Sequence, residues 1–63
     1  MPQVYDEETE VNFTALVGAR VLEQYGLEDG SDLCFNLLET RVIPEDASID
    51  EAARIVAMHL EQA

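Results

Sequence analysis

Cys34 and His59 are the two side chains whose types could support nucleophilic catalysis. They are the only cysteine and the only histidine among 63 residues. A thiol nucleophile needs a base within hydrogen-bond reach and a third group that orients the base. Cys34 falls on the apolar face of a predicted helix, where cysteine usually behaves as a small hydrophobic residue. We therefore expect Cys34 to pack in the core and the protein not to be an enzyme.

Metal and cofactor chemistry is not indicated either. A zinc site takes three or four Cys, His or carboxylate ligands at close spacing, which this sequence does not supply. The acidic segments 28–32 and 45–51 do not match the calcium-loop pattern. The three glycines, Gly18, Gly26 and Gly30, match neither a phosphate-binding loop nor a dinucleotide-binding pattern. We expect no metal and no cofactor.

The carboxylates remain as the candidate functional groups. Fourteen Asp and Glu residues face three arginines and no lysine, which gives a formal net charge of −11. They concentrate in three patches, which we predict to bind a partner. The first patch is Asp6, Glu7, Glu8 and Glu10; the second is Glu28, Asp29 and Asp32; the third is Glu45, Asp46, Asp50 and Glu51.

This charge limits the classes of partner. Direct binding to nucleic acid requires basic residues that displace counterions from phosphates, and an anionic membrane repels an acidic surface. A basic protein surface is the expected partner. DNA carries one charge about every 1.7 Å of its axis, and carboxylates on a rigid bundle could imitate part of that array. The sequence thus favours an inhibitor or regulator that occupies the basic surface of a nucleic-acid-handling enzyme or complex.

A second interpretation of the acidity stays open. Acidic, lysine-free composition also follows from a high-salt habitat or codon bias, and solvated acidic faces commonly serve only solubility. The protein would then be a homo-oligomeric adaptor or an antitoxin-like module. In size, acidity and lack of catalytic residues the chain resembles the small inhibitors that bacteriophages make against host nucleic-acid enzymes, anti-CRISPR proteins among them. This resemblance is one of character, without a shared motif, and it implies no residue roles.

The N-terminal part of the sequence predicts an arm followed by a helix. Residues 1–10 hold four carboxylates and a proline without helical periodicity, so we expect an extended arm. Residues 11–25 form a helical pattern, and Gly26 follows where a left-handed cap is expected. This helix is apolar on two opposite sides. One stripe is predicted as a self-association surface of a possible homodimer: Val11, Ala15, Gly18 and Leu22.

The middle of the sequence is ambiguous between helix and strand. We predict a helix over 32–41, with Ser31 or Asp32 as its N-cap. Residues 33–43 also fit the alternation of a strand, because short apolar runs satisfy both periods.

The third helix, over 49–61, has the clearest signals. Ser48 and Glu51 match a capping box ahead of a periodic apolar run that includes Val56. The expected fold is an all-α three-helix bundle in one domain, residues 1–63, with α+β as the alternative. In an up-down-up bundle, the first and third acidic patches share one end and the second patch occupies the other.

The expected environment is the cytoplasm. A lone thiol suits a reducing compartment, and no stretch approaches the roughly 18 apolar residues that span a bilayer. A basic, hydrophobic signal segment is also missing at the N-terminus of the sequence.

Overall fold

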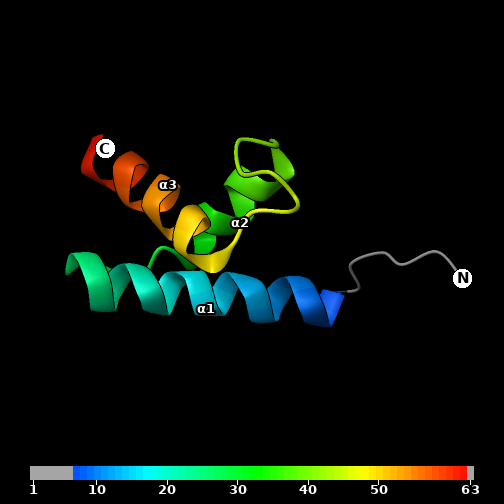
Figure 1. Cartoon of the computed structure of the whole chain (residues 1–63), viewed down its shortest axis with the longest axis horizontal. Coiled ribbons are helices and arrows are strands. Elements are labelled where there is room, and N and C mark those ends of the chain that lie inside the picture. The colour runs from blue at the N-terminus through cyan, green and yellow to red at the C-terminus, as the bar shows by residue number, and fades with distance from the viewer. Residues whose placement is uncertain (1–6, 63) are drawn as a thin grey trace, which may run out of the picture.

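Three helices make up the fold in the computed structural model, which describes residues 7–62, with side chains described from Thr9 onward. They are α1 (Glu7–Tyr25), α2 (Ser31–Glu39) and α3 (Ile49–Gln62). Figure 1 shows α2 and α3 packed on the same side of the longer α1. Over residues 7–62 there is no strand, so the all-α prediction is confirmed and the strand alternative for 33–43 is wrong.

Helix α1 begins at Glu7, four residues earlier than predicted. Residues 7–10 of the expected arm are therefore helical, while 1–6 lie outside the described residues. The run of acidic residues that suggested an arm suits a first helical turn, because carboxylates there interact favourably with the helix dipole. The helix ends at Tyr25, as expected, and is followed by Gly26, whose φ is 71° and whose N–H donates to the Leu22 carbonyl at 3.1 Å.

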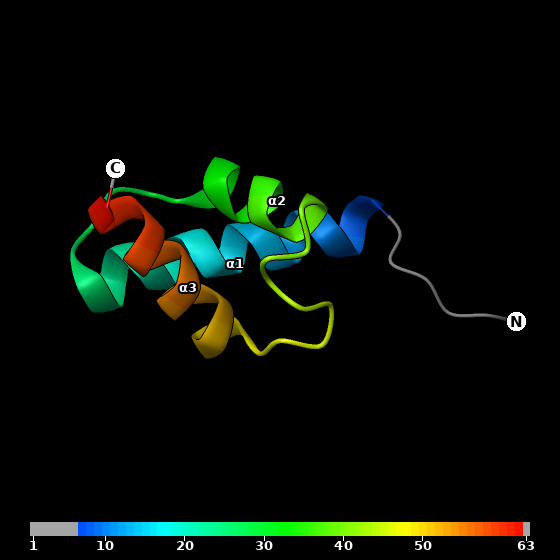
Figure 2. The same ribbon diagram turned by 90° about the horizontal axis from the view of Figure 1, so that it is seen from above.

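The link from α1 to α2 folds back along α1 instead of extending beyond its end (Figure 2). It brings the start of α2 against Gly18, where an added Cβ would collide with the side chains of Asp29 and Ser31. The N-cap of α2 is Gly30, so the predicted caps, Ser31 and Asp32, are wrong. Asp29 instead accepts hydrogen bonds at its Oδ1 from the Ser31 N–H at 2.9 Å and the Ser31 hydroxyl at 2.6 Å.

Helix α2 ends at Glu39, two residues before the predicted boundary. Arg41 has a left-handed backbone with φ 64°. Its N–H donates to the Leu38 carbonyl at 3.2 Å, and the Val42 N–H donates to the Leu37 carbonyl at 2.9 Å. This pair of bonds is the Schellman motif, which here forms with arginine in the position usually held by glycine.

Helix α3 begins as its capping sequence predicts. The Glu51 N–H donates to the Ser48 hydroxyl oxygen at 3.1 Å, and Asp50 and Glu51 lie in the first turn. The helix continues one residue past the predicted end, to Gln62.

The core lies where α2 and α3 meet the buried face of α1. Ala52 and Ala53 of α3 are fully buried, and Val56 is fully buried as predicted. Cys34 is also fully buried. The buried hydrophobic cluster consists of Val17, Val21, Cys34, Leu37, Ile43, Ala52, Ala53 and Val56. None of the helices described is both long and apolar enough to cross a membrane.

Candidate functional site

The packing of the helices leaves most of the predicted carboxylates at the surface. Glu10 is half-buried. The other patch members with described side chains are exposed: Glu28, Asp29, Asp32, Glu45, Asp46, Asp50 and Glu51. Asp6 and the side chains of Glu7 and Glu8 lie outside the described part of the chain.

The first and third acidic patches meet beside α1. Glu10 on α1 and Glu45 in the α2–α3 link line one small hollow of about 80 Å³, together with Phe13 and Leu38. This placement agrees with the expectation that these two patches share one end of the bundle.

The second patch does not lie wholly at the opposite end, and the expected bracketing arrangement is wrong for Asp32. Because the α1–α2 link folds back, Asp32 comes beside Val11 and Ala15 and lines a pocket with them. One acidic side chain of each predicted patch, Glu10, Asp32 and Glu45, therefore lines a pocket beside the N-terminal half of α1.

Asp50 and Asp29 are patch members that have structural partners. Asp50 forms an ion pair with Arg20 that connects the start of α3 to α1. The Nε atom of Arg20 also lies 3.8 Å from Oε1 of Glu23. Asp29 is the acceptor that orders the first turn of α2. Asp32 makes no hydrogen bond or ion pair with another described residue. Asp32 is exposed.

The predicted self-association stripe is only partly a surface. Val11 and Leu22 are 60% and 55% exposed, and Ala15 is exposed as well. Gly18 is buried under the start of α2, so its assignment to this surface is wrong. Helical periodicity groups Gly18 with exposed neighbours on α1. It does not show that the link to α2 folds back over this residue.

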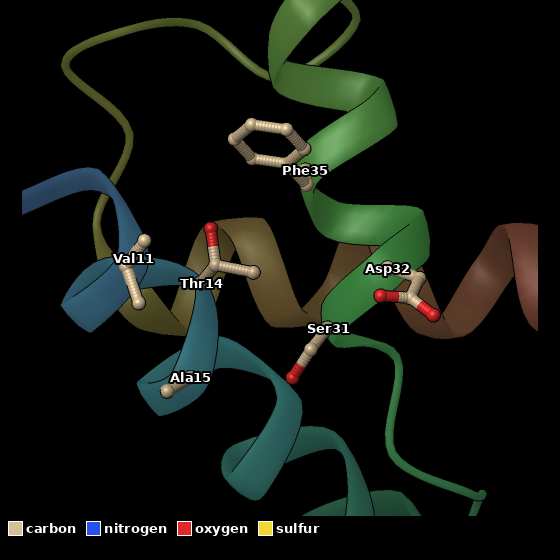
Figure 3. A pocket seen from close by; sticks show the side chains of 6 residues that line it. All are labelled: Val11, Thr14, Ala15, Ser31, Asp32 and Phe35. Atoms are coloured by element: carbon tan, nitrogen blue, oxygen red, sulfur yellow. The ribbon is translucent and has the colours of Figure 1, made fainter. Parts of the chain in front are cut away.

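A pocket of about 260 Å³ opens between α1 and the first turns of α2 (Figure 3). On each of the two helices, the residues that line the pocket are three or four positions apart and therefore lie on one face. The lining residues are Val11, Thr14, Ala15, Ser31, Asp32 and Phe35. The sequence did not indicate that Thr14 and Phe35 line a pocket. The spacing of Asp32 and Phe35 predicts that they lie on one face of the same helix. Their position against α1 depends on the fold and does not follow from the spacing.

Thr14 and Cys34 are both buried, and the Thr14 side chain also lines this pocket. Burial raises the pKa of the Cys34 thiol, and the nearby Thr14 hydroxyl, which can donate to a thiolate, lowers that pKa by a smaller amount. The Thr14 hydroxyl oxygen has no hydrogen-bond partner of normal geometry. A buried thiol with a raised pKa is a poor nucleophile.

His59 is half-buried in the last turn of α3. Within residues 7–62, no group of three or more His, Cys, Asp or Glu side chains is arranged to hold a metal ion. Comparisons of this chain with protein-family models, with curated proteins and with solved structures find no match.

Proposed function

We propose that this protein is a binding protein without a catalytic step, which inhibits or regulates a partner by occupying the partner's basic surface. The partner is a nucleic-acid-handling enzyme or complex, and the carboxylates take the place of phosphates. The reducing cytoplasm is the compartment that suits its single free, buried thiol.

One observation carries the proposal: the fold leaves its acidic side chains in solvent on and around one helix, with little basic charge to neutralise them. Arg20 is committed to Asp50 and Glu23. Arg41 and Arg54 are exposed, against fourteen carboxylates in the sequence. Such a surface attracts a basic partner from a distance and raises the association rate.

The proposal is tested by affinity capture from a cell lysate with the protein as bait and elution in a salt gradient. The expected result is a basic nucleic-acid-binding protein that is released at moderate salt and competed by added DNA or RNA. Counterion-dependent recognition explains both features.

Matched baits separate recognition from bulk charge. Glu28→Gln with Asp32→Asn neutralises two patch carboxylates, and Glu39→Gln with Glu61→Gln neutralises two exposed carboxylates outside the patches. The first bait should lose the captured protein at lower salt than the second. Equal elution from both baits, or capture that DNA and RNA do not compete, contradicts the proposal.

Self-association is a second candidate function, favoured by the exposure of Val11 and Leu22 on α1. In that case the protein is an oligomeric adaptor or antitoxin-like module, and the acidity keeps the assembly soluble. Sedimentation equilibrium tests it: Leu22→Glu should convert a dimer to a monomer without loss of helical circular dichroism. A wild-type protein that is monomeric at high concentration excludes this function.

A further inference from the structure

We infer that the pocket between α1 and α2 is the place where the basic partner inserts one arginine side chain. This inference rests on the proposed function, because it names the residue type that the acidic surface recognises. It assigns the pocket to a guanidinium group specifically, rather than to positive charge in general.

One wall of the pocket comes from α2. The Phe35 ring is 40% exposed and extends from α2 toward Thr14 and Val11 (Figure 3). Asp32 lies three residues earlier on the same helix, and its exposed side chain also lines the pocket. A guanidinium group can stack on an aromatic ring and donate two parallel hydrogen bonds to a carboxylate. The α2 wall offers both contacts.

The floor of the pocket comes from α1 and is mainly aliphatic. Val11 and Ala15 lie one helical turn apart and can cover the methylene stem of an arginine, which buries along apolar surface while its charged end stays polar. Ser31 cannot serve as a free donor, because its hydroxyl already donates to Asp29.

Thr14 supplies the second independent observation. Its side chain lines the pocket, the residue is 7% exposed, and its hydroxyl oxygen has no hydrogen-bond partner of normal geometry. A buried polar group without a partner is unfavourable, so a guest that donates a hydrogen bond there is favoured over one that does not. Figure 3 shows this hydroxyl directed toward the Phe35 ring, which must shift for a donor to reach it.

Side chains other than arginine would make fewer of these contacts in the pocket. An aliphatic guest leaves Asp32 and Thr14 without a donor. Lysine is a compact, strongly hydrated charge that neither stacks as a plane nor pairs in a bidentate way. The pocket volume, about 260 Å³, is several times the roughly 30 Å³ that one water molecule takes up in the liquid, so it admits a long side chain.

The experiment uses hexaarginine and hexalysine peptides as probes in an NMR titration of the full chain. Hexaarginine should bind tighter than hexalysine by about two- to fivefold, the size expected of a cation–π contact at an exposed site. Its largest chemical-shift changes should fall on Thr14, Asp32 and Phe35. In Phe35→Leu, which keeps an apolar side chain, the preference for hexaarginine should fall, because the stacking contact is lost.

Two further variants separate this site from general acidity. Asp32→Asn should weaken hexaarginine binding more than Glu39→Gln, which removes the same charge from an exposed position of α2 outside the pocket. Thr14→Val should raise the melting temperature, because it removes an unpaired buried hydroxyl, and should lower the preference for hexaarginine. A purely structural role for Thr14 would change the first measurement and not the second.

The outcomes distinguish this inference from the proposed function. Equal binding of both peptides, with shifts spread over all acidic patches, overturns the arginine pocket and leaves recognition of basic surfaces standing. Failure of both peptides to bind at low salt overturns both. Self-association that covers Val11 and Phe35 also overturns the arginine pocket, because the site is then filled by a second copy.

Discussion

Gly26 and Arg41 have nearly the same left-handed backbone, with φ 71° and 64°, although only glycine adopts it without steric cost. For an L-residue this conformation costs about 1–2 kcal/mol. We predict that Gly26→Ala lowers the free energy of unfolding by about 1 kcal/mol, while Arg41→Gly raises it by about 0.5–1 kcal/mol. An added Cβ at Gly26 meets no atom within 4 Å, so the first change acts through the backbone alone. Urea denaturation measures both.

The control for this pair is Arg41→Ala, which removes the same charge as Arg41→Gly but retains a Cβ. It should not reproduce the stabilisation. If the alanine and glycine variants are equally stable, the gain comes from the lost charge and the backbone explanation fails.

Cys34 makes stability depend on pH in the alkaline range. Burial raises its pKa above the ordinary value of 9.0, so the unfolded chain releases this proton at a lower pH than the folded protein does. The resulting stability is fully present below pH 9.0 and is lost as the pH rises through and above that value. We predict that the unfolding free energy measured from pH 8 to 10.5 falls less steeply in Cys34→Ala than in the wild type. Parallel slopes for the two proteins contradict this.

At the scale of elements, the start of α3 depends on one hydroxyl. The Ser48 side chain accepts the Glu51 N–H, one of the donors that a helix start leaves without an internal partner. We predict that Ser48→Ala destabilises the protein by about 1 kcal/mol and that Ser48→Asp retains most of the stability, because aspartate is an equivalent cap. Thermal unfolding followed by circular dichroism compares the three. A neutral Ser48→Ala would mean that packing alone holds the first turn.

Local signals predicted an element well where the chain itself determines the local structure. The capping box at Ser48 and the glycine after Tyr25 each act through backbone groups a few residues away, so sequence spacing is sufficient to recognise them. The end of α2 was not predictable in this way, because Arg41 adopts a conformation that its residue type disfavours. Hydrogen bonds from Arg41 and Val42 back to α2 hold it there.

The candidate site was predictable in its residue types but not in its arrangement. Composition identified the carboxylates, and helical periodicity identified most of the apolar stripe on α1. The pocket at Thr14 and Phe35 exists only because the first link runs back along α1, a route that depends on the close approach at Gly18. A helical wheel treats each helix alone and cannot show which residues of two helices share a pocket.

At the scale of the whole molecule, the core is small and its margin is narrow. A chain of this length has a total stability of roughly 3 to 9 kcal/mol. Val56 is fully buried in the cluster, whereas Met58, two residues later on α3, is 48% exposed. We predict that Val56→Asp unfolds the protein, because it buries an unpaired charge, and that Met58→Asp stays folded. Circular dichroism at low temperature distinguishes them; a folded Val56→Asp protein contradicts the assigned core.

The net charge of −11 also acts on the molecule as a whole, through repulsion among carboxylates that the few arginines do not offset. Raising the ionic strength from about 0.01 M to 0.15 M shortens the Debye length from about 30 Å to about 8 Å and screens this repulsion. The same salt weakens the exposed Arg20–Asp50 pair, but a surface ion pair contributes only about 0–1 kcal/mol.

We therefore predict that added sodium chloride raises the melting temperature while it weakens binding to a basic partner. The two effects have opposite signs because salt screens repulsion within the protein and attraction between the proteins. In the Glu39→Gln, Glu61→Gln protein, which carries two fewer negative charges, the melting temperature should depend less on salt. A melting temperature that falls with salt in the wild type would contradict this prediction. It would show that the arginine ion pairs stabilise the fold by more than the repulsion among carboxylates destabilises it.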